Sequence, residues 1–202
     1  MREAGIGRVL VASLHQAISD ILPTRLGFYE NWLNAEGLRE GTIGLAPLYA
    51  VLSFLRQEEG SAYELITARA GEYAADWTVQ EMPPMQRSLV KAAPPWLRGR
   101  ILLRLAQSLV RSSYSGSRAV STVRGGIARV DLRASVFCTV RDRVSQPLCG
   151  FYAAAFTRLI ALFDMAATIE VIACRGTGEP SCVFNVSMLT RQSGQPATVD
   201  AV

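Results

Sequence analysis

The feature that most constrains the fold is a change in the spacing of apolar residues along the chain. Up to Ser113 the apolar residues recur at intervals of three and four, as in amphipathic helices, whereas from Val130 to Val140 they alternate with polar residues. Alternation is typical of a strand with one buried face. The order predicts an α+β fold, in which N-terminal helices pack on a C-terminal antiparallel sheet with one inserted helix.

The helical part is divided by prolines and glycines, which end helices. We expect helices at residues 7–22, 26–36, 45–59, 63–75, 85–92 and 96–113. In the last of these, Arg98, Arg104 and Arg111 lie off the apolar stripe, so this helix should be basic. Residues 115–126, rich in Ser and Gly, are expected to form a loop or an irregular hairpin.

The last third predicts a strand, a helix and a hairpin. We expect strands at 130–140, 168–174 and 182–188, an apolar helix at 150–163, and a hairpin turn at 175–181. The polar residues at 190–202 should form a frayed tail. The length fits one domain over 1–189.

Charge is distributed unevenly along the chain. Residues 87–143 contain twelve basic and two acidic residues, net +10, whereas the remainder contains nine basic and fifteen acidic residues, net −6. A basic stretch can pair with the acidic part of its own fold, or bind a carboxylate-bearing ligand, nucleic acid or an anionic membrane surface. Its aromatic residues are too few to favour nucleic acid, so we expect no nucleic-acid partner.

The sequence predicts neither export nor a membrane span. Gly5, Gly7 and Arg8 interrupt any apolar core of a signal peptide. The most apolar stretch, 151–173, carries charged residues that would be costly in a bilayer. We therefore expect a cytoplasmic protein with reduced thiols.

Four cysteines lie in the last third. Cys174 and Cys182 flank the predicted hairpin turn and Cys149 starts the preceding helix, so three thiolates should meet. Such a group favours a tetrahedral metal, above all zinc. The fourth ligand would be Glu170, placed by the alternation on the same strand face as Cys174, or Cys138 from the strand before. Because cysteine is among the most buried residue types, buried thiols without a metal are the simplest interpretation, ahead of the metal site and of a catalytic thiol.

The sequence favours binding over catalysis. The sole histidine, His15, has no nucleophile near it in the sequence. The glycines that follow Arg175 lie between two strands and not before a helix, so we expect no nucleotide cofactor. Phe151 and Tyr152 adjoin Cys149 and are candidates for lining a flat apolar pocket.

Two stretches carry a resemblance to a known family. The string Cys149-Gly-Phe-Tyr-Ala-Ala-Ala-Phe-Thr-Arg-Leu precedes a hairpin of the form Cys-x-x-x-Gly-x-x-x-Cys-x-Phe, met by Cys174, Gly178, Cys182 and Phe184. Together they resemble the C-terminal signature of the 4-vinyl reductase domain family. A wider similarity, over Gly5-Ile-Gly7 and residues 74–77, 83–95 and 97–113, resembles the family's bacteriochlorophyll 4-vinyl reductase group.

The resemblance implies a fold related to transport-particle (TRAPP) subunits and haem-nitric-oxide sensor domains. It also implies a pocket for a hydrophobic small molecule, most simply a tetrapyrrole or chlorophyll precursor. The chain would then be a carrier or accessory factor in (bacterio)chlorophyll biosynthesis and photosynthesis, acting as a homodimer or with a biosynthetic enzyme complex. Two alternatives remain: a reductase of a chlorophyllide vinyl group, and a dimeric TRAPP-like scaffold or aromatic-ligand sensor.

The resemblance further implies which residues bind. Arginines of the basic helix would contact ring carboxylates of such a ligand. The expected ligand-binding residues are Trp96, Arg100, Arg104, Phe151 and Tyr152.

Some relatives hold a structural zinc with three cysteines and a glutamate, which lies three residues before the hairpin cysteine. Here Val171 has that position, and Glu170 is one residue further away. The expected metal ligands are therefore Cys149, Cys174, Cys182 and Glu170. Cys138 is the alternative to Glu170 as the fourth ligand.

Overall fold

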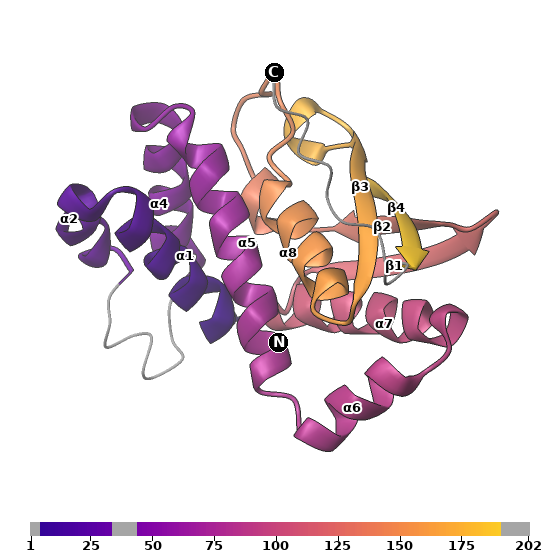
Figure 1. The fold of residues 1–202 in the computed structure, drawn as a ribbon. Helices are drawn as coiled ribbons and strands as arrows, with labels where there is room; N and C mark the ends of the chain where they lie inside the picture. Colours follow the sequence, from indigo (N-terminus) through magenta and orange to yellow (C-terminus); the bar gives the residue numbers. More distant parts are fainter. Residues whose placement is uncertain (1–4, 34–43, 191–202) are drawn as a thin grey trace, which may run out of the picture.

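The structure, a computed structural model, describes residues 5–33 and 44–190 (Figure 1). The helices are α1 (Arg8–Ile21), α2 (Leu26–Glu30), α4 (Leu45–Glu58), α5 (Ala62–Gln80), α6 (Pro84–Ala92), α7 (Pro95–Ser113) and α8 (Gly150–Ala161). The strands are β1 (Arg118–Arg124), β2 (Ile127–Arg133), β3 (Met165–Ala173) and β4 (Cys182–Thr190). They form one antiparallel sheet in the order β1-β2-β4-β3, which confirms the predicted α+β fold.

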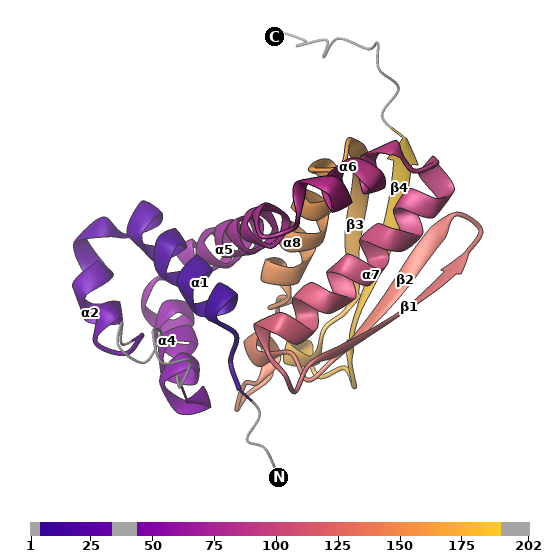
Figure 2. The ribbon, with the colours of Figure 1, turned by 90° about the horizontal axis from the view of Figure 1, so that it is seen from below.

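The molecule has a helical part and a sheet part that meet along α5 and α8. Helices α1, α2 and α4 lie on the far side of α5 from the sheet, and α7 and α8 cover one face of the sheet (Figures 1 and 2). The covered face buries apolar residues of β2 and β4: Ala128, Val130, Leu132, Phe184 and Val186. On the opposite face, Arg129 and Glu170 are exposed.

Helices α5 and α8 approach each other most closely at a glycine. A Cβ atom on Gly71 would lie 2.1 Å from the carbonyl oxygen of Phe151 and 3.0 Å from the backbone nitrogen of Ala155. Only a residue without a side chain permits this approach. The contact fixes the first turn of α8, and with it Cys149, the residue just before the helix.

The helices lie close to their predicted positions. The helix predicted at 63–75 extends to Gln80, and the helix predicted at 26–36 ends at Glu30, with its positions from 34 onward outside the described residues. The tail predicted at 190–202 also lies outside them, except for Thr190, the last residue of β4. None of the described helices combines the length and apolar character needed to cross a bilayer.

The strand predicted at 130–140 is wrong beyond Arg133. Ala134 adopts a left-handed conformation with φ 57°, which turns the chain, and Val136–Cys138 form a 3-10 turn. The side chains of this 3-10 turn are buried and apolar, so the apolar pattern of the strand continues past the point where the strand ends. Residues 115–126, predicted as a loop or an irregular hairpin, contain the regular strand β1 and the turn into β2.

The packing of α5 on α8 predicts the effect of one substitution. Gly71→Ala should lower the free energy of unfolding by about 1–3 kcal/mol, because the added methyl group forces two backbones apart. Gly27→Ala in α2 is the matched control, since a Cβ there meets no atom within 4 Å. Urea unfolding measures both variants. Equal stability of Gly71→Ala and the parent chain would contradict this account of the packing.

Candidate functional site

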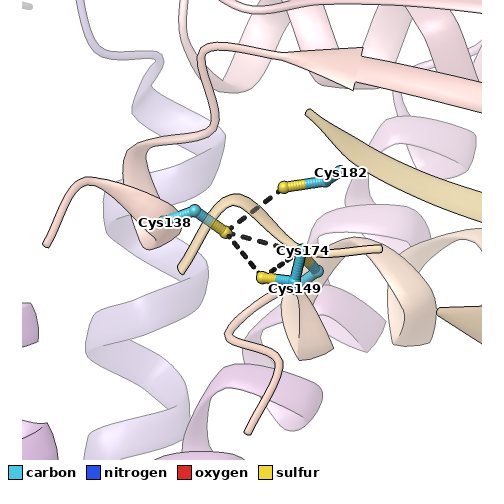
Figure 3. A group of neighbouring side chains, drawn as sticks. All are labelled: Cys138, Cys149, Cys174 and Cys182. Carbon is cyan, nitrogen blue, oxygen red and sulfur yellow. Dashed lines mark hydrogen bonds between the residues drawn. The ribbon is translucent and has the colours of Figure 1, made fainter. Parts of the chain in front are cut away.

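Four cysteine side chains meet at one end of the sheet (Figure 3). Each comes from a separate segment: Cys138 ends the 3-10 turn after β2, Cys149 precedes α8, Cys174 follows β3 and Cys182 begins β4. All are buried, with exposed fractions of 0–3%. Their Sγ atoms all lie within 4.8 Å of one another, so the cysteine cluster could hold a metal ion.

The distances in the cysteine cluster fit a metal better than a disulfide. Cys149 Sγ lies 3.2 Å from Cys174 Sγ, and Cys138 Sγ lies 3.4 Å from Cys182 Sγ. A disulfide needs about 2.05 Å, and all four cysteines are free. A tetrahedral ion about 2.3 Å from each sulfur would separate the sulfurs by about 3.8 Å. Small side-chain movements would therefore admit such an ion.

Hydrogen bonds favour negative charge on two of the sulfurs. The backbone N–H of Leu148 donates to Cys174 Sγ at 3.3 Å, and that of Arg175 donates to Cys182 Sγ at 3.4 Å. The pKa of Cys174 is lowered, mainly by hydrogen bonds from the neighbouring thiols of the cluster. The pKa of Cys149 is raised by its contact with Cys138, by the other sulfurs and by burial. The pKa of Cys182 is also lowered, mainly by hydrogen bonds from Cys138 and Cys149, so the cluster favours negative charge on two sulfurs but holds four thiolates only around a cation.

Of the two candidates for the fourth ligand, Cys138 lies in the cysteine cluster and Glu170 does not. Glu170 is exposed on β3, where it lies opposite Asn185 in the register of β4. The expectation that Glu170 shares a strand face with Cys174 was wrong, because the register of β3 shifts between Val171 and Ala173. This irregularity breaks the alternation on which the expectation depended.

Buried aromatic rings lie beside the cysteine cluster. The rings of Phe137 and Phe151 stack with centroids 4.7 Å apart, and Tyr152 meets both edge-on. Phe151 and Tyr152 are fully buried, and burial raises the pKa of the Tyr152 hydroxyl. The structure thus places these two predicted ligand-binding residues in the core, at the start of α8 next to Cys149.

A half-open hollow of about 350 Å³ lies between the first turns of α7 and the sheet. Its apolar wall comes from both layers: Leu103, Val123, Met165 and Met188. Trp96 and Arg100 also line it, with the Arg100 guanidinium carbon 5.9 Å from the centre of the Trp96 ring. Arg104 is exposed and is not among the lining residues. Two of the predicted ligand-binding residues therefore come together here.

The sheet side of this hollow was missed by sequence reasoning. Val123 and Gly126 belong to the hairpin of β1 and β2, within the stretch predicted as a loop or an irregular hairpin. A signal was available in Gly125-Gly126, because a Gly-Gly pair between β-forming residues is typical of a tight hairpin. Both glycines have positive φ, 56° and 80°. Met165 and Met188 gave no signal, since their proximity depends on strand register.

Comparisons with known proteins support the fold. No protein-family profile matches the sequence, and no curated protein sequence is significantly similar to it. Among solved structures, the Fe(II) unliganded H-NOX protein from K. algicida aligns with a TM-score of 0.60 and 13% identity, over 94% of this chain and 100% of that chain. A point mutant of that protein aligns with a TM-score of 0.59, the same identity and the same coverage.

A second kind of structure is also similar. The phenol-responsive sensory domain of the transcription activator PoxR, crystallised with phenol, aligns with a TM-score of 0.51 and 17% identity, over 74% of this chain and 77% of that chain. At such identities the similarity establishes the fold alone. These findings lend no support to the 4-vinyl reductase resemblance. The chain therefore has the α+β fold seen in H-NOX proteins and in this sensory domain.

Proposed function

We propose that this chain binds a hydrophobic small molecule that carries a carboxylate, in the hollow between α7 and the sheet. The observation that carries this proposal is a mainly apolar wall with a single cation, Arg100, among its lining residues. No acidic partner of Arg100 occurs in the part of the chain that the structure describes. Binding sites for small molecules are typically apolar hollows with a few polar groups that orient the ligand.

The lining residues favour a planar ligand. An arginine can form two parallel hydrogen bonds with a carboxylate. Trp96 offers an exposed ring surface, and the methionine side chains of Met165 and Met188 adapt to flat rings. A tetrapyrrole carboxylate has these properties and agrees with the sequence resemblance, which supports a carrier or accessory role in chlorophyll-type biosynthesis. Because the hollow is small and half open, part of such a ring would stay outside it.

The size of the hollow also supports a smaller ligand. Its volume of about 350 Å³ lies near the lower end of the usual range for small-molecule sites. The PoxR domain, whose fold is similar, was crystallised with phenol. A sensor of a single-ring aromatic acid is therefore the second candidate function.

We also propose that the cysteine cluster holds a structural zinc ion. Four protein thiolates would fill its tetrahedral coordination and leave no open position for a reaction. The amides of Leu148 and Arg175 would orient and stabilise two of the thiolates. The ion would cross-link the 3-10 turn, α8 and the hairpin of β3 and β4.

Arg100→Gln tests the ligand proposal. We expect the affinity for a dicarboxylic porphyrin, or for an aromatic carboxylate, to fall about tenfold or more, because a hydrogen bond to a charged group is lost. Arg104→Gln is the matched control on the same helix, since Arg104 lies outside the hollow. Absorbance or fluorescence titration measures both. Equal losses in the two variants, or no spectral change with the parent chain, would exclude this site.

Metal analysis of two variants tests the zinc proposal. The purified chain should contain about one zinc ion. Cys138→Ser should lose the metal and much of the folding stability, whereas Glu170→Gln should keep both, because Glu170 lies outside the cluster. If Cys138→Ser does not fold, Glu170→Gln still decides the ligand set. Loss of zinc from Glu170→Gln, or a parent chain free of zinc, would refute the proposal.

A further inference from the structure

Helix α6 exposes apolar side chains that an amphipathic helix would normally bury. Val90 is the only buried residue of this helix. Met85 and Leu89, four residues apart and therefore neighbours on one side of the helix, are 73% and 64% exposed. Large apolar side chains exposed on one side of a helix indicate a surface that binds a partner molecule or a membrane.

Helix α7, which follows α6, exposes a further large apolar side chain near its start. Trp96, in the first turn of α7, is 66% exposed. The two helices join at one corner and diverge from it (Figures 1 and 2). Arg98 fixes this corner, since its guanidinium donates to the carbonyl oxygens of Ala93 at 3.0 Å and Phe163 at 3.3 Å. The α6–α7 corner, residues 84–104, is therefore a defined structural unit.

The same corner is positively charged. Residues 84–104 contain basic residues and no acidic one: Arg87, Lys91, Arg98, Arg100 and Arg104. Asp164 pairs with Lys91 at 3.1 Å, and Glu81 lies three residues before α6. Residues 84–104 therefore carry a net positive charge even with Lys91 paired, so the corner is suited to an anionic partner.

We propose that the α6–α7 corner docks on an anionic lipid surface, with Met85, Leu89 and Trp96 inserted among the headgroups. Apolar and tryptophan side chains combined with lysine and arginine are what such a surface binds. A second copy of the chain fits less well, because a symmetric dimer through this corner would bring two basic surfaces together.

Lipid docking goes beyond the proposed ligand binding and does not depend on it. The two sites share Trp96, which lines the hollow and is also exposed on the corner. A hydrophobic ligand would then pass between the bilayer and the hollow without crossing water.

Sedimentation of the full chain with vesicles tests the proposal. The chain should bind vesicles of mixed phosphatidylcholine and phosphatidylglycerol, and pure phosphatidylcholine much less. Added salt should weaken the binding, since the attraction is electrostatic in part. Tryptophan emission should shift to the blue on binding, and Trp96→Phe should remove the shift. No binding to the anionic vesicles would overturn the proposal.

Leu89→Ser and its matched control Leu65→Ser locate the docking surface. Both leucines are exposed on helices, 64% and 62%, and Leu65 lies on α5. Leu89→Ser should weaken vesicle binding about tenfold, and Leu65→Ser should leave it unchanged. Porphyrin binding should be unaffected in both, so failure of docking is separable from failure of ligand binding. Equal losses of vesicle binding, or a dimer in analytical ultracentrifugation that Leu89→Ser dissociates, would contradict lipid docking.

Discussion

The C-terminal half of this protein depends on the meeting of four cysteine sulfurs from separate segments of the chain. The segment between β2 and α8 has little regular structure beyond one 3-10 turn, and the connection of β3 to β4 is short and irregular. The cysteine cluster joins both to the start of α8. Helix α8 is thus fixed at its first turn by the cluster and along its side by the contact at Gly71. The position of α8 in turn determines which face of the sheet is covered and how the sheet lies relative to the helices.

The two ends of the sheet differ in chemistry. One end carries the cysteine cluster, which is buried and has no free coordination position once a metal is bound. At the other end, Met165 and Met188 meet Trp96 and Arg100 in a half-open hollow. The exposed α6–α7 corner lies beside that open end, since Trp96 belongs to both. This arrangement is consistent with the proposed structural metal at one end, the proposed ligand site at the other, and the proposed exchange of ligand with a lipid surface.

Sequence patterns predicted the helices and the inserted α8 well, because burial of one helix side leaves a period that the chain shows directly. They failed where the backbone departs from regular geometry. The positive φ of Ala134 ends β2 early, and the register shift after Val171 separates Glu170 from Cys174. The convergence of the hairpin cysteines with Cys149 was predictable from spacing. The choice of Cys138 over Glu170 was not, because it depends on these two irregularities. Phe151 and Tyr152 were assigned to a pocket because composition alone does not distinguish core rings from exposed ones.

X-ray absorption spectroscopy at the zinc edge tests the central claim most directly, because it reports the kind, number and distance of the atoms around the metal. A tetrathiolate centre predicts four sulfur neighbours at about 2.3 Å and no nitrogen or oxygen neighbour. A spectrum that requires an oxygen ligand would place a carboxylate in the site. A zinc-free protein that stays folded with its four thiols reduced would show that packing alone holds the cysteine cluster together. Either result would contradict the account given for the C-terminal half.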